Sequence, residues 1–138
     1  MREPFNSAQN SVLIECCAIH KGREVFALLA KRMAESRGLR IRFVVHVPRE
    51  DGDAAFDADL VRRYATEFRE RNWHGEALPE VLCDPRSLEL ERAKRSSMHA
   101  KVIVVDEEVA LITSANFTAA AQTKNIEVGA LVRQAAIA

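Results

Sequence analysis

The first third of the chain switches between two hydrophobic periods, and this switch fixes the fold class. Residues 11–18 (SVLIECCA) form a short apolar run with β-branched side chains, which predicts a buried strand. Residues 23–37 repeat apolar side chains at helical spacing, and Gly38 stands where a helix cap would lie. Residues 39–47 alternate apolar with mainly polar side chains up to Pro48, as a strand does. A strand, a helix and a strand in this order predict a βαβ unit with parallel strands, and therefore an α/β fold.

The rest of the chain continues this alternation. Helical spacing predicts a helix over residues 60–71 and a short one over 117–122, and we expect Trp73 to pack in the core beside the longer helix. Residues 84–97 carry many charges without periodicity, which predicts a mobile loop. Four further short strands are expected, the middle two of which form a tight hairpin: 81–83, 99–106, 109–113 and 126–132.

The composition is that of one globular domain covering residues 1–138. With 48% hydrophobic and 29% charged residues, the chain can bury a core of ordinary size. The formal net charge is zero, which argues against a protein that binds nucleic acid by charge alone. Cys16, Cys17 and Cys83 show neither a disulfide framework nor zinc-ligand spacing, so no metal is expected. The sequence has no signal-peptide core and no apolar stretch of bilayer length, which predicts a cytoplasmic protein that does not contact a membrane.

Polar side chains interrupt the apolar hairpin in a pattern suited to phosphate chemistry. His99 and Lys101 lie two residues apart on the strand expected over 99–106, so they share one face. An imidazole beside an ammonium is a plausible nucleophile toward a phosphodiester, because the cation offsets the charge of the phosphate, and attack would leave a phosphohistidine. The alternative for such a pair is a partly exposed polar edge. The basic run 92–95 either guides phosphate toward the pair or forms a solvated loop.

Further polar residues complete a recognisable pattern. His-x-Lys-(x)4-Asp over residues 99–106 and Ser-x-Asn over 114–116 together resemble the signature of the phospholipase D superfamily. Residues 125–129 (NIEVG) resemble the downstream strand of that superfamily. The resemblance implies a mixed sheet flanked by helices and phosphodiester chemistry through a phosphohistidine, with neither metal nor other cofactor. One residue departs from the pattern, because Thr113 stands where the superfamily usually carries Gly.

The resemblance also implies roles for single residues. His99 is expected to be the nucleophile, and Glu127 is expected to be the carboxylate that orients the His99 ring. Asp106 is expected to be structural and to tie down the turn at the end of its strand through residues 107–108. The implied phosphate contacts are Lys101, Ser114 and Asn116.

The chemistry needs a second histidine. Cleavage through a phosphohistidine requires an acid for the leaving oxygen, and histidine is suited to this near neutral pH. His20, His46 and His74 lack a lysine two residues later, so the chain carries one motif. The resemblance therefore implies that a second copy of the chain supplies its own His99 across a two-fold axis. His20 and His46 follow expected strands at their carboxyl ends, where ligands gather in α/β sheets, so both are pocket candidates, with solvated loop histidines as the alternative.

A second resemblance involves several blocks spread over most of the chain. Residues 20–26, 78–81, 83–88 and 113–118 resemble the phospholipase D-like proteins of bacterial DISARM anti-phage systems. This resemblance implies other defence-system proteins as partners. In the superfamily a helix usually precedes the first strand and another follows the last. We therefore expect this chain to be truncated at both ends and to expose apolar surface on one face of its sheet.

Three functions compete at this point. The first is a metal-independent phosphodiesterase that acts on nucleic acid, with DNA as the expected substrate, in anti-phage defence. The second is a non-catalytic subunit that binds nucleic acid or assembles a complex with the same fold. The third is a lipid-directed phosphatidyl transfer enzyme, which would need an amphipathic or apolar interfacial segment that the sequence does not show. The first and second predict the same residues, since an intact motif makes chemistry possible without proving that it happens.

Overall fold

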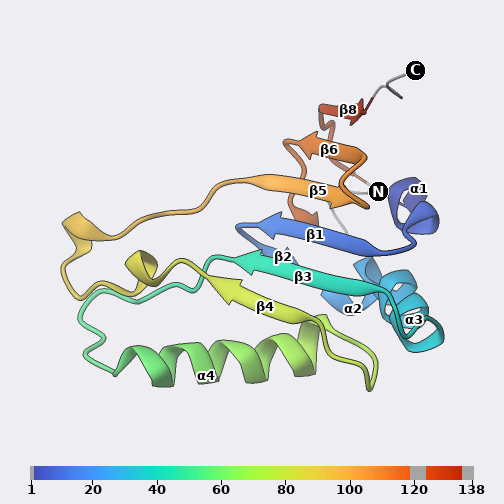
Figure 1. Ribbon diagram of the computed structural model, residues 1–138. Helices are drawn as coiled ribbons and strands as arrows, with labels where there is room; N and C mark the ends of the chain where they lie inside the picture. Colours follow the sequence, from blue (N-terminus) through green and yellow to red (C-terminus); the bar gives the residue numbers. More distant parts are fainter. Residues whose placement is uncertain (1, 119–123, 135–138) are drawn as a thin grey trace.

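A six-stranded mixed sheet forms the centre of the computed structural model, which describes residues 2–118 and 124–134 (Figure 1). The strand order across the sheet is β4-β3-β1-β5-β6-β8. The strands are β1 (Ser11–Cys16), β3 (Arg40–Val45), β4 (Glu80–Cys83), β5 (Lys101–Val105), β6 (Val109–Thr113) and β8 (Gly129–Arg133). A separate two-stranded sheet pairs β2 (Ile19–His20) with β7 (Phe117–Thr118). This mixed sheet, with helices beside it, confirms the expected fold class.

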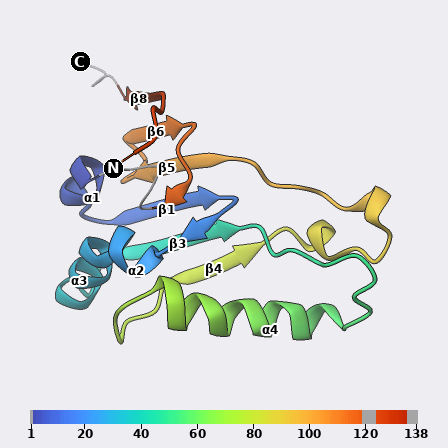
Figure 2. The same ribbon diagram turned by 180° about the vertical axis from the view of Figure 1, so that it is seen from behind.

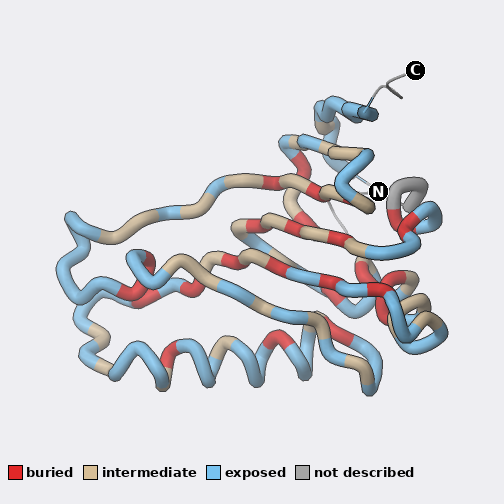
Figure 3. Tube along the Cα trace, in the orientation of Figure 1, coloured by how far each residue is buried: buried red, intermediate tan, exposed pale blue. Residues whose placement is uncertain are grey.

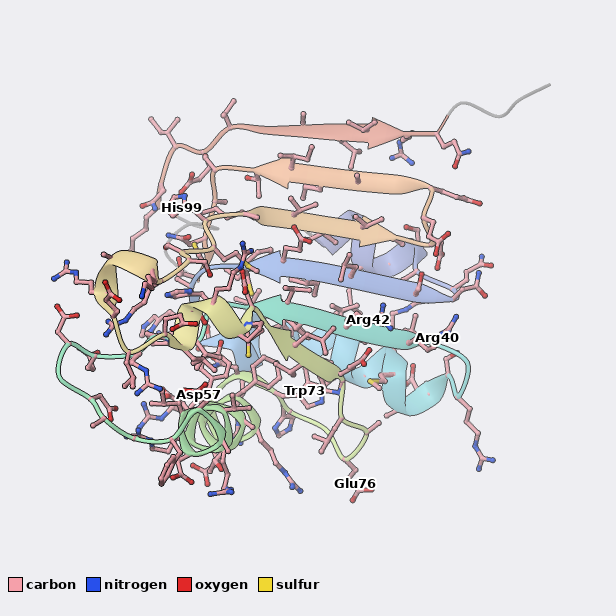
Figure 4. The ribbon with its side chains drawn as sticks, turned by 60° about the vertical axis from the view of Figure 1, so that its left-hand side comes forward. Arg40, Arg42, Asp57, Trp73, Glu76 and His99 are labelled. Atoms are coloured by element: carbon pink, nitrogen blue, oxygen red, sulfur yellow. The ribbon has the colours of Figure 1, made fainter. Side chains whose placement is uncertain are left out.

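The strand directions bring several strand ends to one edge. β1, β3 and β4 run parallel, which confirms the βαβ prediction, whereas β5 is antiparallel to β1 and β6 is antiparallel to β5. The carboxyl ends of β1, β3 and β4 therefore lie beside the amino end of β5. We call this side of the sheet the His99 edge, because residue 99 lies there, two positions before the start of β5 (Figure 4). Carboxyl ends of parallel strands are the usual position of a ligand site in an α/β sheet.

The helices cover one face of the sheet. They are α1 (Arg2–Ser7), α2 (Gly22–Val25), α3 (Ala27–Glu35) and α4 (Asp57–Glu67), the last continued by a π-helical turn, Phe68–Asn72. Phe43 on β3 lies at the centre of the resulting core, with ring centroids 5.0 Å from Phe26, 5.1 Å from Phe68 and 6.0 Å from Trp73. α2 and α3 lie in front of the sheet in Figure 2, and Figure 3 shows the buried positions alternating along β1 and β3. Trp73 is buried, as expected for a core residue.

The opposite face of the sheet carries no helix within the described residues. Its side chains include Arg42, Leu82, Ile112 and Val132, which the strand register places on the same side, and all of them are exposed. The apolar exposure expected on one face is therefore present. One expectation about the ends is wrong, because α1 precedes β1 where we expected no helix.

Two predicted helices differ from the structure. The helix expected over 23–37 is broken at Phe26, whose backbone leaves helical geometry while its ring packs against Phe43 and Phe117. The helix expected over 117–122 is wrong at its start, because Phe117 and Thr118 pair with β2 as β7; residues 119–122 lie outside the described part of the chain. In both places a tertiary contact overrides the local pattern.

The segment expected as a mobile loop has defined structure. It contains two 3-10 turns, Pro85–Leu88 and Arg92–Lys94. The buried guanidinium of Arg49 donates to the Leu88 carbonyl at 2.6 Å, and Arg95 donates to the Arg49 carbonyl at 2.8 Å. These bonds join the loop after β3 to the loop before β5, and the two extend together from the His99 edge (Figure 1).

Candidate active site

His99 and Lys101 meet at the start of β5. The strand begins at Lys101, so His99 lies just outside the ladder and is exposed, whereas Lys101 is only 7% exposed. Lys101 shares the buried face of β5 with Ile103 and Val105, and its side chain extends from that face toward the sheet edge. Its Nζ lies 3.2 Å from His99 Nδ1 and donates to the His99 carbonyl at 3.1 Å. The predicted pair is therefore brought together.

The contact between the two side chains determines where the imidazole proton lies. An ammonium group has donors and no acceptor, so Nδ1 of His99 must accept the hydrogen bond from Lys101. A neutral imidazole in that arrangement carries its proton on Nε2. With Lys101 charged and His99 neutral, the contact favours the tautomer that carries the lone pair on Nδ1 and the proton on Nε2.

Ser114 and Glu127 form a second pair at the same edge. Ser114 follows β6 and Glu127 precedes β8, and the antiparallel ladder between these strands brings them together. Ser114 Oγ donates to Glu127 Oε2 at 2.5 Å and accepts from the Val128 N–H at 3.1 Å. The Ser114 hydroxyl and the Asn125 amide hold the pKa of Glu127 below its ordinary value, and the charge of Lys101 acts in the same direction. Ser114, a predicted phosphate contact, thus uses its single hydroxyl proton in the hydrogen bond to Glu127.

The predicted role of Glu127 has no direct contact behind it. Among the described residues its recorded hydrogen-bond partners are Ser114 and Asn125, while the Nδ1 atom of His99 is held by Lys101. Lys101 contacts His99, and its charge helps to lower the pKa of Glu127. The His99–Lys101 pair and the Ser114–Glu127 pair are therefore neighbours. Orientation of the His99 ring by Glu127 stays a prediction.

Thr113 replaces the usual glycine without disturbing this turn. Its hydroxyl accepts from the Ala115 N–H at 3.0 Å and donates to the Val128 carbonyl at 3.2 Å, so it closes the turn around Ser114. A glycine is found instead on the neighbouring strand, where Gly129 pairs with Thr113. A Cβ atom at Gly129 would lie 3.1 Å from the Ile112 carbonyl oxygen and 3.3 Å from Thr113 Oγ1.

Asn116 is held by a residue that the sequence analysis did not single out. Ala115 and Phe117 on either side of it are buried, so its backbone is anchored. The Cys17 thiol donates to Asn116 Oδ1 at 3.3 Å. Nothing local in the sequence points to this contact, because 99 residues separate the two partners.

Asp106 lies at the other end of β5, far from these groups. Its carboxylate accepts from the backbone N–H groups of Gln9, Asn10 and Ser11 at 2.7–2.8 Å. Burial alone would raise the pKa of Asp106, but these three donors outweigh burial and hold the pKa below its ordinary value. Asp106 therefore anchors the segment before β1, and its recorded partners are there rather than at residues 107–108.

The two candidate pocket histidines lie near the site. His20 is exposed and pairs with Thr118 in the small sheet, two residues beyond Asn116. His46 follows β3 at the His99 edge, and its Nδ1 is buried without a hydrogen-bond partner in the described part of the structure. Their contact with a ligand stays a prediction.

The basic run before His99 is paired with two nearby carboxylates, one of which two arginines share. Arg92 and Arg95 both pair with Asp51, at 2.6 and 3.0 Å, and Lys94 pairs with Glu91 at 2.5 Å. These pairs favour the structural alternative over phosphate guidance, because each cation already has a partner. Within the described residues, no three His, Cys, Asp or Glu side chains are placed to hold a metal ion.

A groove of about 680 Å³ lies elsewhere, around the amino ends of β1 and β3. Arg40 and Arg42 line it, and Figure 4 shows both at the opposite end of the sheet from His99. Arg42 is paired with Glu80 at 2.5 Å, and none of the predicted site residues lines the groove. The candidate site residues therefore lie at the His99 edge and not in this groove.

Sequence comparison covers the chain to different extents. Residues 1–138 match the profile of a family described as "Cardiolipin synthase, PLD-like domain". A stretch of 37 residues, 27% of the chain, is 57% identical to the DISARM protein DrmC of Bacillus paralicheniformis. The chain covers 15% of that protein's length, so the resemblance expected over most of the chain is found over a much shorter stretch. No helix in the described ranges combines the length and apolarity of a membrane span.

Solved structures share the fold at low sequence identity. NucT from Helicobacter pylori superposes with a TM-score of 0.58 at 15% identity, covering 92% of this chain and 70% of that one. Nuc from Salmonella typhimurium, a phospholipase D family member, superposes with a TM-score of 0.54 at 22% identity, covering 95% of this chain and 71% of that one. Phosphatidylserine synthase from Haemophilus influenzae superposes with a TM-score of 0.57 at 16% identity, covering 95% of this chain and 30% of that one. The profile match spans the whole chain, and the chain therefore belongs to the phospholipase D superfamily, in the PLD-like domain family of that profile.

Proposed function

We propose that this chain is a metal-independent phosphodiesterase that cleaves nucleic acid, with DNA as substrate, through a phosphohistidine on His99. The observation that carries the proposal is the buried ammonium of Lys101 held 3.2 Å from His99 Nδ1 at the edge where Ser114, Asn116 and Glu127 also lie. A fixed positive charge beside a nucleophile stabilises the charge that develops on a transferring phosphoryl group. The 37-residue similarity to a DISARM protein supports a role in anti-phage defence, with other proteins of such a system as partners.

In the proposed mechanism, phosphate binding replaces two internal contacts of the site. Lys101 and Ser114 each donate to an internal acceptor, His99 Nδ1 and Glu127 respectively. A phosphodiester offers anionic oxygens to both donors, and the Lys101 ammonium gains more from an anionic oxygen than from a neutral imidazole nitrogen. When Lys101 turns to the phosphate, Nδ1 of His99 is free to take up the ring proton, and Nε2 gains the lone pair. Glu127, released by Ser114, is then available to accept from Nδ1–H.

The covalent steps balance with two histidines. His99 Nε2 attacks phosphorus and forms a P–N bond while the P–O bond to the leaving oxygen breaks. The His99 of a second chain, protonated, gives its proton to that oxygen. Water then attacks phosphorus, the same second histidine takes the water proton, and the P–N bond breaks to regenerate His99. One imidazole cannot serve as nucleophile and acid in the same step, and the proposal assigns the acid role to a second copy of the chain.

The geometry limits how two copies can meet. β8 is an edge strand in the described sheet, and pairing two β8 edges would be the simplest contact between sheets. β5 lies two strands inside that edge, so such a pair would keep the two β5 strands about 24 Å apart at ~4.8 Å per strand spacing. Two His99 rings could not then share one phosphate. The productive dimer therefore brings two His99 edges together, with the turn 114–116 and Glu127 near the dyad.

A non-catalytic subunit is the second candidate, and one observation favours it. In the described state the hydrogen bond from Lys101 keeps the His99 proton on Nε2, which is the unreactive tautomer. If phosphate does not displace Lys101, the same residues bind a nucleic-acid backbone without cleaving it.

The decisive experiment compares cleavage and binding in chelator. Single- and double-stranded DNA are incubated with the protein in EDTA, alongside His99→Ala and the matched control His74→Ala. His74 is exposed and lies before β4, away from the His99 edge. We expect cleavage by the wild type and by His74→Ala, and none by His99→Ala. Binding without cleavage supports the non-catalytic candidate, strict dependence on magnesium contradicts the phosphohistidine mechanism, and cleavage of phosphatidylglycerol vesicles but not DNA would favour a lipid substrate.

A further inference from the structure

We infer that the Cys17 thiol is a positioning residue that orients the side-chain amide of Asn116, so that its nitrogen and not its oxygen is presented to a phosphate. The inference rests on the proposed function, because it gives Asn116 a phosphate to contact. It adds a residue outside the motif, from a different part of the chain.

The two sheets fix the partners relative to each other. Cys17 directly follows β1 at the His99 edge, and β2 begins two residues later. β2 pairs in parallel with β7, with Ile19 opposite Phe117, so the residues preceding these two positions are also held near each other. Phe117 is fully buried and the Thr118 N–H donates to the Asn116 carbonyl at 2.8 Å, which anchors the Asn116 backbone.

The chemistry of the amide makes its orientation matter. A phosphate diester accepts hydrogen bonds at its oxygens, so only the Nδ2 end of Asn116 can bind it, and the Oδ1 end would face it with a repelling lone pair. A half rotation of the terminal torsion exchanges the two ends, and this torsion is broad. Something must therefore choose between the two orientations.

The thiol makes that choice. Cys17 Sγ donates to Asn116 Oδ1 at 3.3 Å, which occupies the oxygen and turns the two N–H donors of Nδ2 toward other acceptors. In the exchanged orientation Nδ2 would face sulfur, which is a weak acceptor. The contact is half-buried, so water competes with it less than at the surface.

Cys83 provides the matched control. It is also a free, half-buried cysteine at the carboxyl end of a strand on the same edge, but no hydrogen bond from its thiol is recorded in the described structure. Replacement of Cys83 removes a thiol of similar exposure without touching Asn116. Cys17→Ser keeps a donor on a slightly shorter side chain, whereas Cys17→Ala removes the donor.

The test measures phosphate binding and turnover together. Cys17→Ala, Cys17→Ser, Cys83→Ala, Asn116→Ala and the double variant Cys17→Ala/Asn116→Ala are compared for DNA cleavage and for the Kd of inorganic phosphate. The Asn116 side-chain NH₂ signals, assigned by their loss in Asn116→Ala, report binding by NMR. We expect Cys17→Ala to weaken phosphate binding and kcat/KM about twofold, because the phosphate must then select one of two equally available amide orientations, and Cys17→Ser to recover most of that loss. Cys83→Ala should match the wild type.

Coupling distinguishes positioning from general structure. In the Asn116→Ala background, Cys17→Ala should have no further effect, because the group that it orients is absent. Multiplicative effects of the two changes, equal loss in Cys17→Ser and Cys17→Ala, or an unchanged phosphate Kd in Cys17→Ala would each overturn the inference. If the wild type binds phosphate but cleaves no DNA, the proposed function fails, while the NH₂ signals and the phosphate Kd still decide on Cys17.

Discussion

The two ends of β5 carry polar groups of opposite kinds. At its carboxyl end, the Asp106 carboxylate accepts three backbone N–H groups of the segment before β1. At its amino end, Lys101 contacts the His99 ring as well as the His99 carbonyl, and the neighbouring Ser114 donates to the Glu127 carboxylate and accepts from the Val128 N–H, so side chains take part on both sides of these contacts. Backbone partners are fixed by the fold, whereas side-chain partners can rotate away. We therefore expect the contacts at the Asp106 end to persist and, under the proposed function, the side-chain contacts at the His99 end to exchange with a ligand.

The difference explains why motif residues need not share a function. His99, Lys101 and Asp106 belong to one sequence pattern, yet the first two lie at the amino end of β5 and the third at its carboxyl end. Asp106 cannot contact a phosphate bound at His99 across that distance. Its part is to hold the loop before β1 against the β5–β6 turn, which keeps β1 and β5 in register.

The largest effect is expected at His99. His99→Asn removes the nucleophile at an exposed position outside the ladder, so cleavage should fall by about a thousandfold or more. The free energy of unfolding should stay the same, since no backbone partner depends on the ring. Cleavage assays and urea denaturation on the same sample check this. Retained turnover would remove His99 from the mechanism.

Lys101 separates activity from stability most sharply. Lys101→Met keeps the length of the side chain but removes a buried ammonium, so kcat/KM should fall by about a hundredfold. Stability should be unchanged or higher, because burial of a charge costs free energy. A large loss of stability in thermal unfolding would show that Lys101 is a structural residue, and the contrast between the two strand ends would fail.

Asp106 should show the reverse. Asparagine tolerates the positive φ of 53° at this position, but its neutral side chain accepts hydrogen bonds from the N–H groups of residues 9–11 more weakly than a carboxylate does. In Asp106→Asn the free energy of unfolding should therefore fall by about 1–3 kcal/mol, with kcat/KM unchanged.

The pH dependence has a definite sign. Because the folded pKa of Asp106 lies below the unfolded value of about 3.9, its stabilisation is complete above about pH 4 and is lost as pH falls through the folded pKa. The gap in unfolding free energy between wild type and Asp106→Asn should therefore close in acid. A constant gap down to the lowest pH would mean that the charge of Asp106 does not act.

The turn beside Asp106 allows a smaller change in the other direction. Glu107 also has a positive φ, 62°, and the Glu108 N–H donates to the Val105 carbonyl, which together describe a type I′ hairpin turn. Glu107→Gly relieves the left-handed strain and should raise the unfolding free energy by about 0.5–1 kcal/mol without altering cleavage. Reduced stability would indicate that the Glu107 side chain has a partner role of its own.

The smallest effect concerns the second copy. In a 1:1 mixture of wild type and His99→Ala, shared sites predict about a quarter of full activity, whereas independent sites predict about half. Asp106→Asn in the same mixture should cost nothing, because its chain keeps both histidine roles. Light scattering tests whether the protein is a dimer, and activity proportional to the wild-type fraction would argue for a site within one chain.

Local patterns in the sequence determined much of this protein. The βαβ unit, the β5–β6 hairpin and the place of Lys101 on its strand follow from periodicity and short spacing, because neighbours on one strand share its geometry. The expected start of that strand at residue 99 is wrong, because β5 begins at Lys101 and His99 lies outside the ladder. Ser114 and Asn116 also follow from their place after the hairpin. Where a strand pairs with a distant segment, however, the pattern failed: Phe117 reads as the start of a helix but forms β7 with Ile19.

Tertiary structure alone decided the partners of the site residues. Cys17 contacts Asn116 across 99 residues, and Asp106 reaches back 95–97 residues to the segment before β1. The β6–β8 ladder brings Ser114 beside Glu127, so the Ser114 hydroxyl donates to the Glu127 carboxylate. Sequence spacing fixes which side chains a strand presents, but the pairing of strands from opposite halves of the chain depends on the summed free energy of the whole core. Which donors are committed and which can turn to a ligand is therefore decided only once the sheet has formed.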